Sequence, residues 1–291
     1  MITGSIVALI TPFNENGGVN YNKLRELIEW HIEEGTDGIL ALGTTAETPA
    51  LTDEEEEKIA EIAIKTCRGK VPVIVGSGSN STDRAVEKSL KFEKMGADAL
   101  LVINPYYNKT NKAGLLKHFY TVADAVNTPI YIYNVPGRTG MSIPFEVFAE
   151  LSKHKNIVGV KEASGDMSLI SKISTLINDS FNVYSGNDDI NIPLMSMGGA
   201  GIISVLANIL PAKAHEMAYS YWHGDPKKAS ELQRYYLNFI NHLFIETNPI
   251  PIKEAMNLMG MNVGGYRMPL CPMDEANKNK LIESMKAINL L

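Results

Sequence analysis

The chain is poor in the residues that build metal and redox sites. Its 291 residues include only two cysteines, Cys67 and Cys271, which lie far apart and match no metal-binding or redox spacing. The six histidines also show no ligand spacing. We therefore expect no bound metal and no cofactor. Two separate thiols are ordinary in a reducing compartment, so the expected location is the cytoplasm.

Long apolar segments and an excess of basic residues are also missing. No uninterrupted apolar run reaches ~18 residues, and Met1–Phe13 lacks the basic start and the cleavage site of a signal peptide. A formal net charge of -6 argues against a nucleic-acid-binding surface and against attraction to anionic membranes. A small anionic substrate is still compatible with this charge, because one arginine or lysine in a pocket can bind a carboxylate.

What the chain does have is a repeated alternation of short apolar runs and helical stretches. Each run is followed by a cluster of Gly, Asn, Thr or Pro and then by a helical pattern. Most runs are apolar on both faces, which is typical of parallel strands covered on both sides. The predicted strands are Ser5–Ile10, Gly38–Leu42, Val71–Gly76, Ala99–Asn104, Pro129–Asn134, Ile157–Lys161, Asn182–Ser185 and Gly201–Leu206.

Eight strand–helix units in succession predict an α/β fold, a (β/α)8 TIM barrel. A doubly wound sheet is the alternative, but it needs a Gly-rich turn after the first strand, and Thr11–Asn14 is not one. After Pro211 only helices are predicted, the last three over 225–244, 250–259 and 274–288. We therefore expect a barrel over residues 1–224, which carries the active site, and a C-terminal helical region over 225–291.

Lys161 is the first candidate for chemistry. It follows Ile157–Val160, so its ammonium group lies at the end of a buried apolar strand, where barrel enzymes place their active sites. Burial disfavours the charged form, and a neutral amine can attack a ketone to form a Schiff base. The alternative is a lysine that reaches the barrel rim or pairs with Glu162 or another carboxylate. Position alone does not separate the two.

Two other strand ends carry four polar residues that suit such chemistry. The phenol of Tyr133 could pass protons beside an imine, or it could simply fill the barrel. Thr44 and Thr45 could hold a small carboxylate, or they could serve only the turn after Gly43. Arg138 could grip a carboxylate with two hydrogen bonds, or it could be an ordinary surface arginine.

Taken together, these segments resemble a known family. Gly38–Glu47 (GILALGTTAE), Tyr133–Thr139 (YNVPGRT), Val158–Glu162 (VGVKE) and Tyr184–Asp188 (YSGND) are similar to motifs of the dihydrodipicolinate synthase and N-acetylneuraminate lyase family. The resemblance covers nearly the whole chain. One departure is Ala46, where the common motif has glycine; a methyl group is tolerable there if φ is negative.

The resemblance implies a pyruvate site. Lys161 would form the imine with pyruvate, and Thr45 would hold the pyruvate carboxylate through its hydroxyl and backbone. The backbone at Gly186 and Ile203 would line the site. The resemblance therefore implies a class I aldolase-type lyase that needs no cofactor.

The resemblance also implies a proton relay and an assembly. Tyr133 would donate and accept the proton, with Thr44 and Tyr107 completing the relay. Tyr107 would reach in from a neighbouring subunit, which implies a homotetramer built as a dimer of dimers.

Arg138 selects within the family. Members that carry this arginine bind the carboxylate of L-aspartate 4-semialdehyde, whereas sialic-acid lyases lack it. The implied reaction condenses pyruvate with the semialdehyde to 4-hydroxy-tetrahydrodipicolinate, a step towards diaminopimelate and lysine. Two alternatives are a lyase or aldolase acting on another keto acid, and a catalytically silent paralogue that only binds.

A second departure concerns inhibition by lysine. In inhibited members, histidines and a glutamate at an inter-subunit cleft hold the lysine, and the matching positions here are Asp53, Glu56 and Arg84. Asn80 and Tyr106 are retained. Because an arginine in place of a carboxylate repels the ammonium group of the ligand, we predict weak or absent inhibition.

Overall fold

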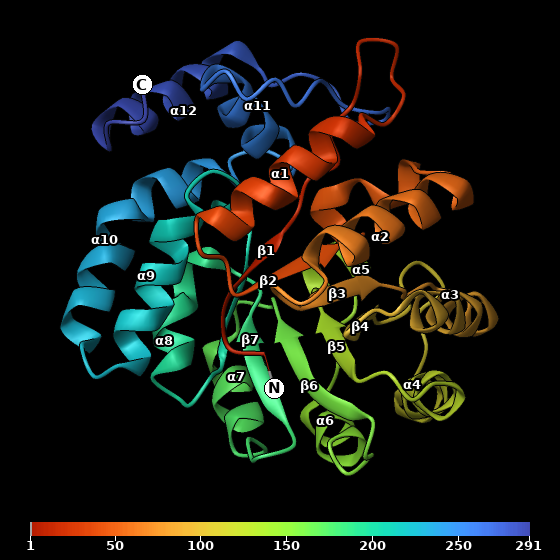
Figure 1. Ribbon diagram of the computed structural model, residues 1–291. Helices are drawn as coiled ribbons and strands as arrows, with labels where there is room; N and C mark the ends of the chain where they lie inside the picture. Colours follow the sequence, from red (N-terminus) through yellow and green to blue (C-terminus); the bar gives the residue numbers. More distant parts are fainter. Residues whose placement is uncertain (1) are drawn as a thin grey trace.

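The computed structural model describes residues 2–291, and a closed barrel of eight parallel strands forms its centre (Figure 1). The strands follow one another around the ring in sequence order, and β1 pairs with both β2 and β8. The closed ring confirms the predicted (β/α)8 barrel and rules out an open doubly wound sheet. The strands are β1 Gly4–Ala8, β2 Gly38–Ala41, β3 Val73–Gly76, β4 Ala99–Ile103, β5 Ile130–Asn134, β6 Ile157–Glu162, β7 Asn182–Ser185 and β8 Gly201–Ser204.

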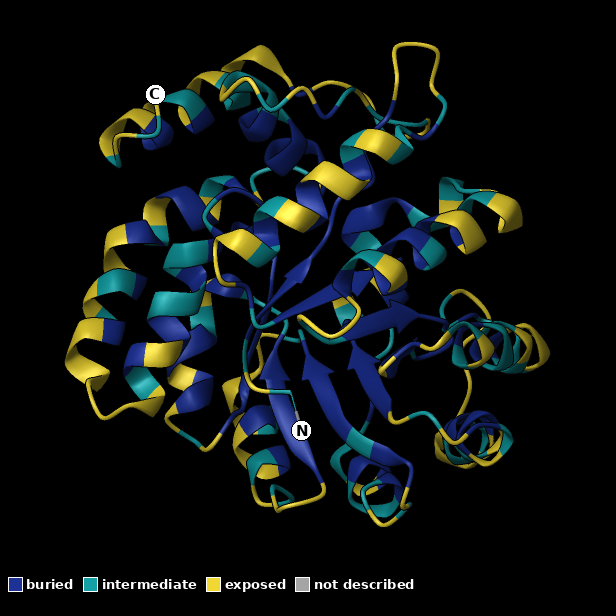
Figure 2. Cartoon of the chain, viewed as in Figure 1, coloured by how far each residue is buried: buried dark blue, intermediate teal, exposed yellow. Residues whose placement is uncertain are grey.

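Helices surround the barrel, with their polar faces outward (Figures 1 and 2). They are α1 Tyr21–Glu33, α2 Asp53–Cys67, α3 Thr82–Met95, α4 Lys112–Ala125, α5 Pro136–Thr139, α6 Phe145–Leu151, α7 Met167–Ser174, α8 Asn191–Met195, α9 Pro211–Trp222, α10 Pro226–His242, α11 Ile250–Leu258 and α12 Glu275–Ala287. Short 3-10 turns follow three strands: η1 Thr44–Ala46 and η2 Thr48–Ala50 after β2, η3 Asp188–Ile190 after β7, and η4 Leu206–Asn208 after β8. In the part of the chain that the model describes, no helix is both long and apolar enough to cross a membrane.

The strands are buried on both faces, as their apolar composition predicts. Side chains that alternate along them divide into two groups. One group packs outward under the helices, and the other fills the barrel interior. The interior group includes Ile6, Ala8, Leu40, Ile74, Ala99, Leu101, Tyr131, Tyr133, Tyr184 and Ile203.

Two predicted strands continue two residues beyond the C-terminal ends of the observed strands. The prediction ran to Ile10 and to Leu206, whereas β1 ends at Ala8 and β8 ends at Ser204. The side chain of Asn208 takes the place of strand pairing there, because it accepts from the Ile10 amide at 3.0 Å and donates to the Ala8 carbonyl at 2.8 Å. Leu206 already belongs to η4.

The C-terminal helices do not stand apart from the barrel. Helix α10 packs along α9. The segment after α11 returns to the segment that follows β1, where the Phe13 amide donates to Val263 O at 3.0 Å. The chain turns between α9 and α10, and Asp225 caps α10 by accepting from the Lys228 amide. A division into separate regions at residues 224 and 225 stays a prediction.

Candidate active site

The barrel places Lys161 directly beside Tyr133. The two residues are partners in the pairing of β5 with β6, and the Lys161 Nζ lies 4.5 Å from the centre of the Tyr133 ring. Lys161 is only 5% exposed, and its neighbours Val160 and Glu162 are also buried. The sequence-based placement of this lysine at the end of a buried strand is therefore confirmed.

The surroundings of Lys161 favour its neutral form. Burial lowers its pKa below the ordinary value of 10.5, and the nearby charge of Arg138 lowers it further. The nearby Tyr133 and Asp188 act in the opposite direction. Among residues 2–291 no carboxylate forms an ion pair with Lys161. This leaves a buried amine without a direct counter-ion.

Glu162 does not neutralise Lys161. Its carboxylate accepts hydrogen bonds from Asn134 Nδ2 at 2.8 Å and from the Ser164 amide at 2.6 Å. Burial raises the pKa of Glu162 above its ordinary value. The alternative in which Lys161 is paired with Glu162 is therefore wrong.

Asp188 is an acidic neighbour whose importance the sequence did not reveal. Its side chain is buried and accepts from the Val205 amide at 2.8 Å, the Leu206 amide at 3.3 Å and the Ser204 hydroxyl. Burial raises the pKa of Asp188, and the charge of Lys161 lowers it. The carboxylate is thus bound to the end of β8 and acts on Lys161 only at a distance. The sequence signals for it were the acidic residues after β7 and the motif Tyr184–Asp188, which ends at this position.

Three predicted site residues line one cavity at the C-terminal end of the barrel. Thr44, Tyr133 and Arg138 all contribute to its wall, and its volume is about 500 Å³. Each of them follows or ends a strand, as the barrel architecture requires. A cavity of this size is within the range of small-molecule sites. Lys161 is not part of the cavity wall, and its Nζ lies over the ring of Tyr133, which is.

Thr45 and Arg138 are linked through a residue of the tail. The side chain of Asn248 donates to Thr45 Oγ1 at 2.9 Å, and Arg138 Nη2 donates to the backbone oxygen of Asn248 at 2.9 Å. Thr45 is buried, so its hydroxyl lies below the cavity surface. Sequence reasoning missed Asn248, which lies 203 positions after Thr45. The only local signal is an Asn-Pro pair just before α11.

Gly186 lies near the lysine, and neither Gly186 nor Ile203 lines the cavity. A side chain at Gly186 would come within 3.1 Å of the Lys161 Cε and 2.6 Å of the Ala163 Cβ, so only glycine leaves room there. Its amide already donates to Glu162 O at 2.7 Å. Ile203 is fully buried in the barrel interior.

Tyr107 stands apart from the other predicted site residues. It is 93% exposed and has a positive φ of 67°, which is unusual for a residue other than glycine. It is not part of the cavity wall, although its neighbour Tyr106 is. Within one chain, therefore, Tyr107 does not meet Thr44 or Tyr133.

The turn that carries the two threonines accepts Ala46 without strain. Ala46 lies inside η1, and the positive φ values of this segment fall on Leu42 and Glu47 instead. The Ala46 carbonyl accepts a hydrogen bond from the Thr11 hydroxyl at 2.7 Å. The methyl group in place of glycine therefore leaves the turn intact.

The positions expected to face lysine line the far part of the same cavity. Arg84 lies 3.4 Å from Asp53, and Lys88 lies 2.6 Å from Glu56. Lys88 adds a cation that the sequence comparison had not considered. Both acidic side chains in this part of the cavity are therefore already paired within the chain.

Comparison with known proteins agrees with this geometry. The model of the Dihydrodipicolinate synthetase family matches residues 1–288. The 4-hydroxy-tetrahydrodipicolinate synthase of Thermoanaerobacter sp. (strain X514) is 53% identical over 290 residues, which cover 99% of this chain and 97% of that protein.

Solved structures of the same kind superpose along the whole chain. Dihydrodipicolinate synthase from Aquifex aeolicus is 45% identical with a TM-score of 0.95, covering 99% of this chain and 98% of that one. The chloride-inhibited enzyme from Acinetobacter baumannii, solved with pyruvate, is 40% identical with a TM-score of 0.97, and both chains are covered completely. The chain therefore belongs to the dihydrodipicolinate synthase family.

Proposed function

We propose that this chain condenses pyruvate with L-aspartate 4-semialdehyde through an imine on Lys161, giving 4-hydroxy-tetrahydrodipicolinate. The observation that carries the proposal is the buried amine of Lys161, which has no carboxylate in ion-pair contact within residues 2–291 and lies 4.5 Å from the centre of the Tyr133 ring. The relative from Thermoanaerobacter, at 53% identity over nearly the full length, is a synthase of this product.

The first step is attack of the neutral Lys161 amine on the keto carbon of pyruvate. Because burial lowers the pKa of Lys161, less free energy is needed to deprotonate it than in water. Tyr133, the adjacent phenol, relays the two amine protons to the former keto oxygen, which leaves as water while the C=N bond of the imine forms. Thr45 holds the pyruvate carboxylate. The Acinetobacter baumannii relative binds pyruvate, which supports the same first substrate here.

The second step joins the two substrates. Tyr133 takes a methyl proton, which converts the imine to an enamine. The enamine carbon attacks the aldehyde of the semialdehyde, so the imine re-forms, and the new alkoxide takes that proton back through Tyr133 and Thr44. Arg138 binds the carboxylate of the semialdehyde, since its guanidinium keeps donors besides the one given to Asn248. The amino group of the second substrate then attacks the imine carbon and releases Lys161, which closes the ring.

The relay includes a residue from a second subunit. Tyr107, exposed and held with a positive φ, serves the site of a neighbouring chain and completes the relay of Tyr133 and Thr44 there. The assembly is a homotetramer built from two tight dimers. The backbone of Gly186 and Ile203 borders the pyruvate next to Lys161.

A coupled assay tests this function directly. Pyruvate and the semialdehyde are supplied with a downstream reductase, and consumption of the reductase cofactor reports product. We expect turnover with the semialdehyde; when a sugar aldehyde replaces it, pyruvate consumption is measured instead, and we expect none. Turnover with the sugar alone would make the chain a lyase of the sialic-acid type, and no turnover with any aldehyde would make it a binding protein.

A further inference from the structure

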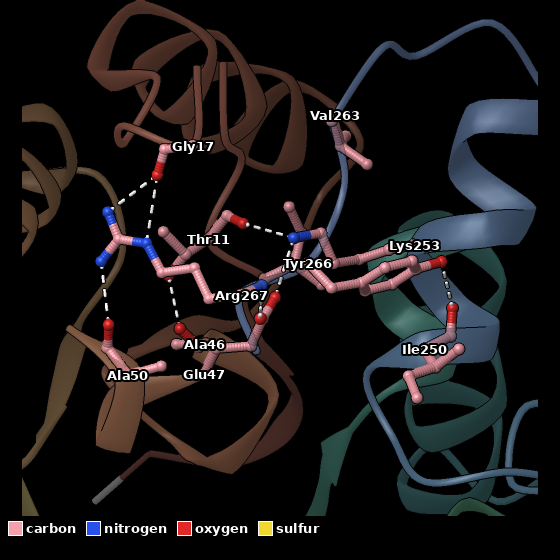
Figure 3. Close-up of polar contacts among 12 residues, drawn as sticks. Thr11, Gly17, Ala46, Glu47, Ala50, Ile250, Lys253, Val263, Tyr266 and Arg267 are labelled. Atoms are coloured by element: carbon pink, nitrogen blue, oxygen red, sulfur yellow. Dashed lines mark hydrogen bonds and ion pairs between the residues drawn. The ribbon is translucent and has the colours of Figure 1, made fainter. Parts of the chain in front are cut away.

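A second buried lysine connects the C-terminal tail to the turn that carries Thr44 and Thr45 (Figure 3). Lys253 of α11 is fully buried. Its Nζ donates to Glu47 Oε1 at 2.8 Å and to the Thr11 carbonyl at 3.0 Å. One amine from the tail therefore reaches both the turn after β2 and the segment after β1.

Glu47 adopts a backbone conformation that its own sequence does not favour. It lies between η1 and η2 with φ 57° and ψ 31°, the left-handed region that suits glycine. Such a conformation persists where the surroundings hold it in place. Both carboxylate oxygens are held: one accepts from Lys253, and the other accepts from the Arg267 amide at 3.0 Å. Both donors belong to the tail.

Thr11 forms hydrogen bonds that hold the same turn from the barrel side. Its carbonyl accepts from Lys253, while its hydroxyl donates to the Ala46 carbonyl at 2.7 Å. Ala46 directly follows Thr44 and Thr45. The turn is therefore fixed at two consecutive residues, Ala46 by Thr11 and Glu47 by the tail.

The ion pair is buried and lies next to an aromatic ring. Side-chain exposure is 0% for Lys253 and 1% for Glu47, and the Lys253 Nζ lies 4.2 Å from the centre of the Phe13 ring. Burial lowers the pKa of Lys253, and the carboxylate of Glu47 opposes that shift. A buried ion pair adds little net stability compared with well-packed apolar side chains, so the value of this one lies in the geometry that it imposes.

We propose that Lys253 and Glu47 are positioning residues that hold the turn from Gly43 to Glu47 in the shape that binds the pyruvate carboxylate. This inference rests on the proposed function, because it assumes that Thr45 binds pyruvate. The tail is then a part of the active site that touches no substrate. Loss of the pair weakens pyruvate binding, whereas binding of the semialdehyde at Arg138 changes little.

The test compares variants of the full-length chain. Lys253→Met removes the cation, and Glu47→Gln with Lys253→Met removes both charges without leaving one unpaired. Thr11→Val is a milder change that deletes only the hydrogen bond to Ala46. Two controls lie in the same tail: Lys278→Met breaks an ion pair with Glu254, and Leu281→Ala opens the core of α12.

Three quantities are measured for each variant: the half-saturating pyruvate concentration in borohydride trapping, the KM for the semialdehyde, and the unfolding midpoint in urea. We expect the half-saturating pyruvate concentration to rise by about 10-fold or more in the double variant, since small misplacements of a binding group are costly. The KM for the semialdehyde should change by less than about 3-fold, which corresponds to a smaller change in binding free energy than a tenfold effect requires. Thr11→Val should show a smaller rise in the same direction.

Stability separates positioning from folding. The double variant should unfold near the wild-type midpoint and still bind pyruvate poorly, whereas Leu281→Ala should unfold early and bind pyruvate normally. Pyruvate binding that simply follows stability across the series would overturn the inference alone. Wild-type protein that traps no pyruvate at all would overturn the proposed function and this inference with it.

Discussion

Two buried lysines, one in the barrel and one in the C-terminal tail, have different roles. Lys161 and Lys253 are 5% and 0% exposed, each lies over an aromatic ring, and burial lowers the pKa of both. They differ in their partners. Lys253 has the carboxylate of Glu47 at 2.8 Å, whereas Lys161 has no carboxylate in ion-pair contact among residues 2–291.

This difference in pairing decides the chemistry. A charged amine bound to a carboxylate is a poor nucleophile, because its lone pair carries a proton that the partner stabilises. A buried amine without such a partner costs stability and is more easily deprotonated. Lys161 lies beside Tyr133, at the active-site end of the barrel, whereas Lys253 comes from the tail and lies over the Phe13 ring in contact with Glu47. We infer that one lysine reacts and that the other holds the turn beside it.

The largest expected effect is on turnover. Lys161→Ala should lower kcat/KM in the coupled assay by at least about 10⁴-fold, because the covalent route is lost. Lys253→Met should retain far more activity, with the loss mainly in the KM for pyruvate. If the two variants lost activity equally, the distinction between the two lysines would be wrong.

The next effect is on the free energy of unfolding, where replacing Lys253 should cost more than replacing Lys161. Lys253→Met should lower the free energy of unfolding by about 3–5 kcal/mol, because Glu47 is left buried without a counter-ion. Lys161→Met should be within about 1 kcal/mol of wild type or more stable, because it removes a buried amine that has no partner. Urea unfolding at one fixed protein concentration measures both, since assembly also contributes to stability. Equal losses would contradict the comparison.

A smaller effect tests the second substrate. Arg138→Leu should raise the KM for the semialdehyde by roughly 10-fold or more, which corresponds to the loss of a charged hydrogen bond. Imine formation with pyruvate should change much less. Arg234→Leu on the exposed face of α10 is the matched control and should alter neither. An unchanged KM in Arg138→Leu would argue for a different aldehyde.

The pH dependence gives a further distinction. Because the pKa of Lys161 is lowered from 10.5, its neutral fraction grows at a lower pH than that of an exposed lysine. The rate of trapping with pyruvate and cyanoborohydride should therefore rise with pH and level off below 10.5. Over the same range the unfolded chain binds more protons than the folded one, so unfolding free energy rises with pH, and Lys161→Met should remove that part of the rise. A half-maximal rate at or above pH 10.5 would contradict a reactive buried amine.

The smallest expected effect is that of added lysine. Lys88, like Lys253, is paired with a carboxylate, that of Glu56 at 2.6 Å. Arg84 lies 3.4 Å from Asp53. Both acidic groups are thus occupied, and the cations repel the ammonium group of a ligand. We expect calorimetry to detect no binding of lysine up to about 1 mM. Binding in the micromolar range would show that these pairs open for the ligand.

The sequence predicted those parts of the site that depend on local patterns. Apolar runs on both faces identified the strands, and their polar ends brought Thr44, Tyr133 and Arg138 to one cavity. Lys161 was found because a lysine that follows a buried strand is conspicuous. The family resemblance, and not the strand pattern, pointed to Tyr107, and within one chain this residue is not part of the cavity wall.

The missed residues are those whose contacts join distant parts of the chain. Glu47 and Lys253 are 206 positions apart, and no local pattern links them. Lys253 follows the apolar stretch Ile250–Ile252, which is the signal that identified Lys161, but it lies in a predicted helix where a solvated lysine is ordinary. Which of two such lysines finds a carboxylate depends on tertiary packing, and packing is what the sequence pattern leaves open.

One measurement tests the central claim most directly. The protein is incubated with pyruvate and borohydride, digested, and mapped by mass spectrometry for a carboxyethyl group on lysine. The account predicts modification of Lys161 and none of Lys253, with no adduct in Lys161→Ala. An adduct on another lysine, or trapping that survives in Lys161→Ala, would contradict it.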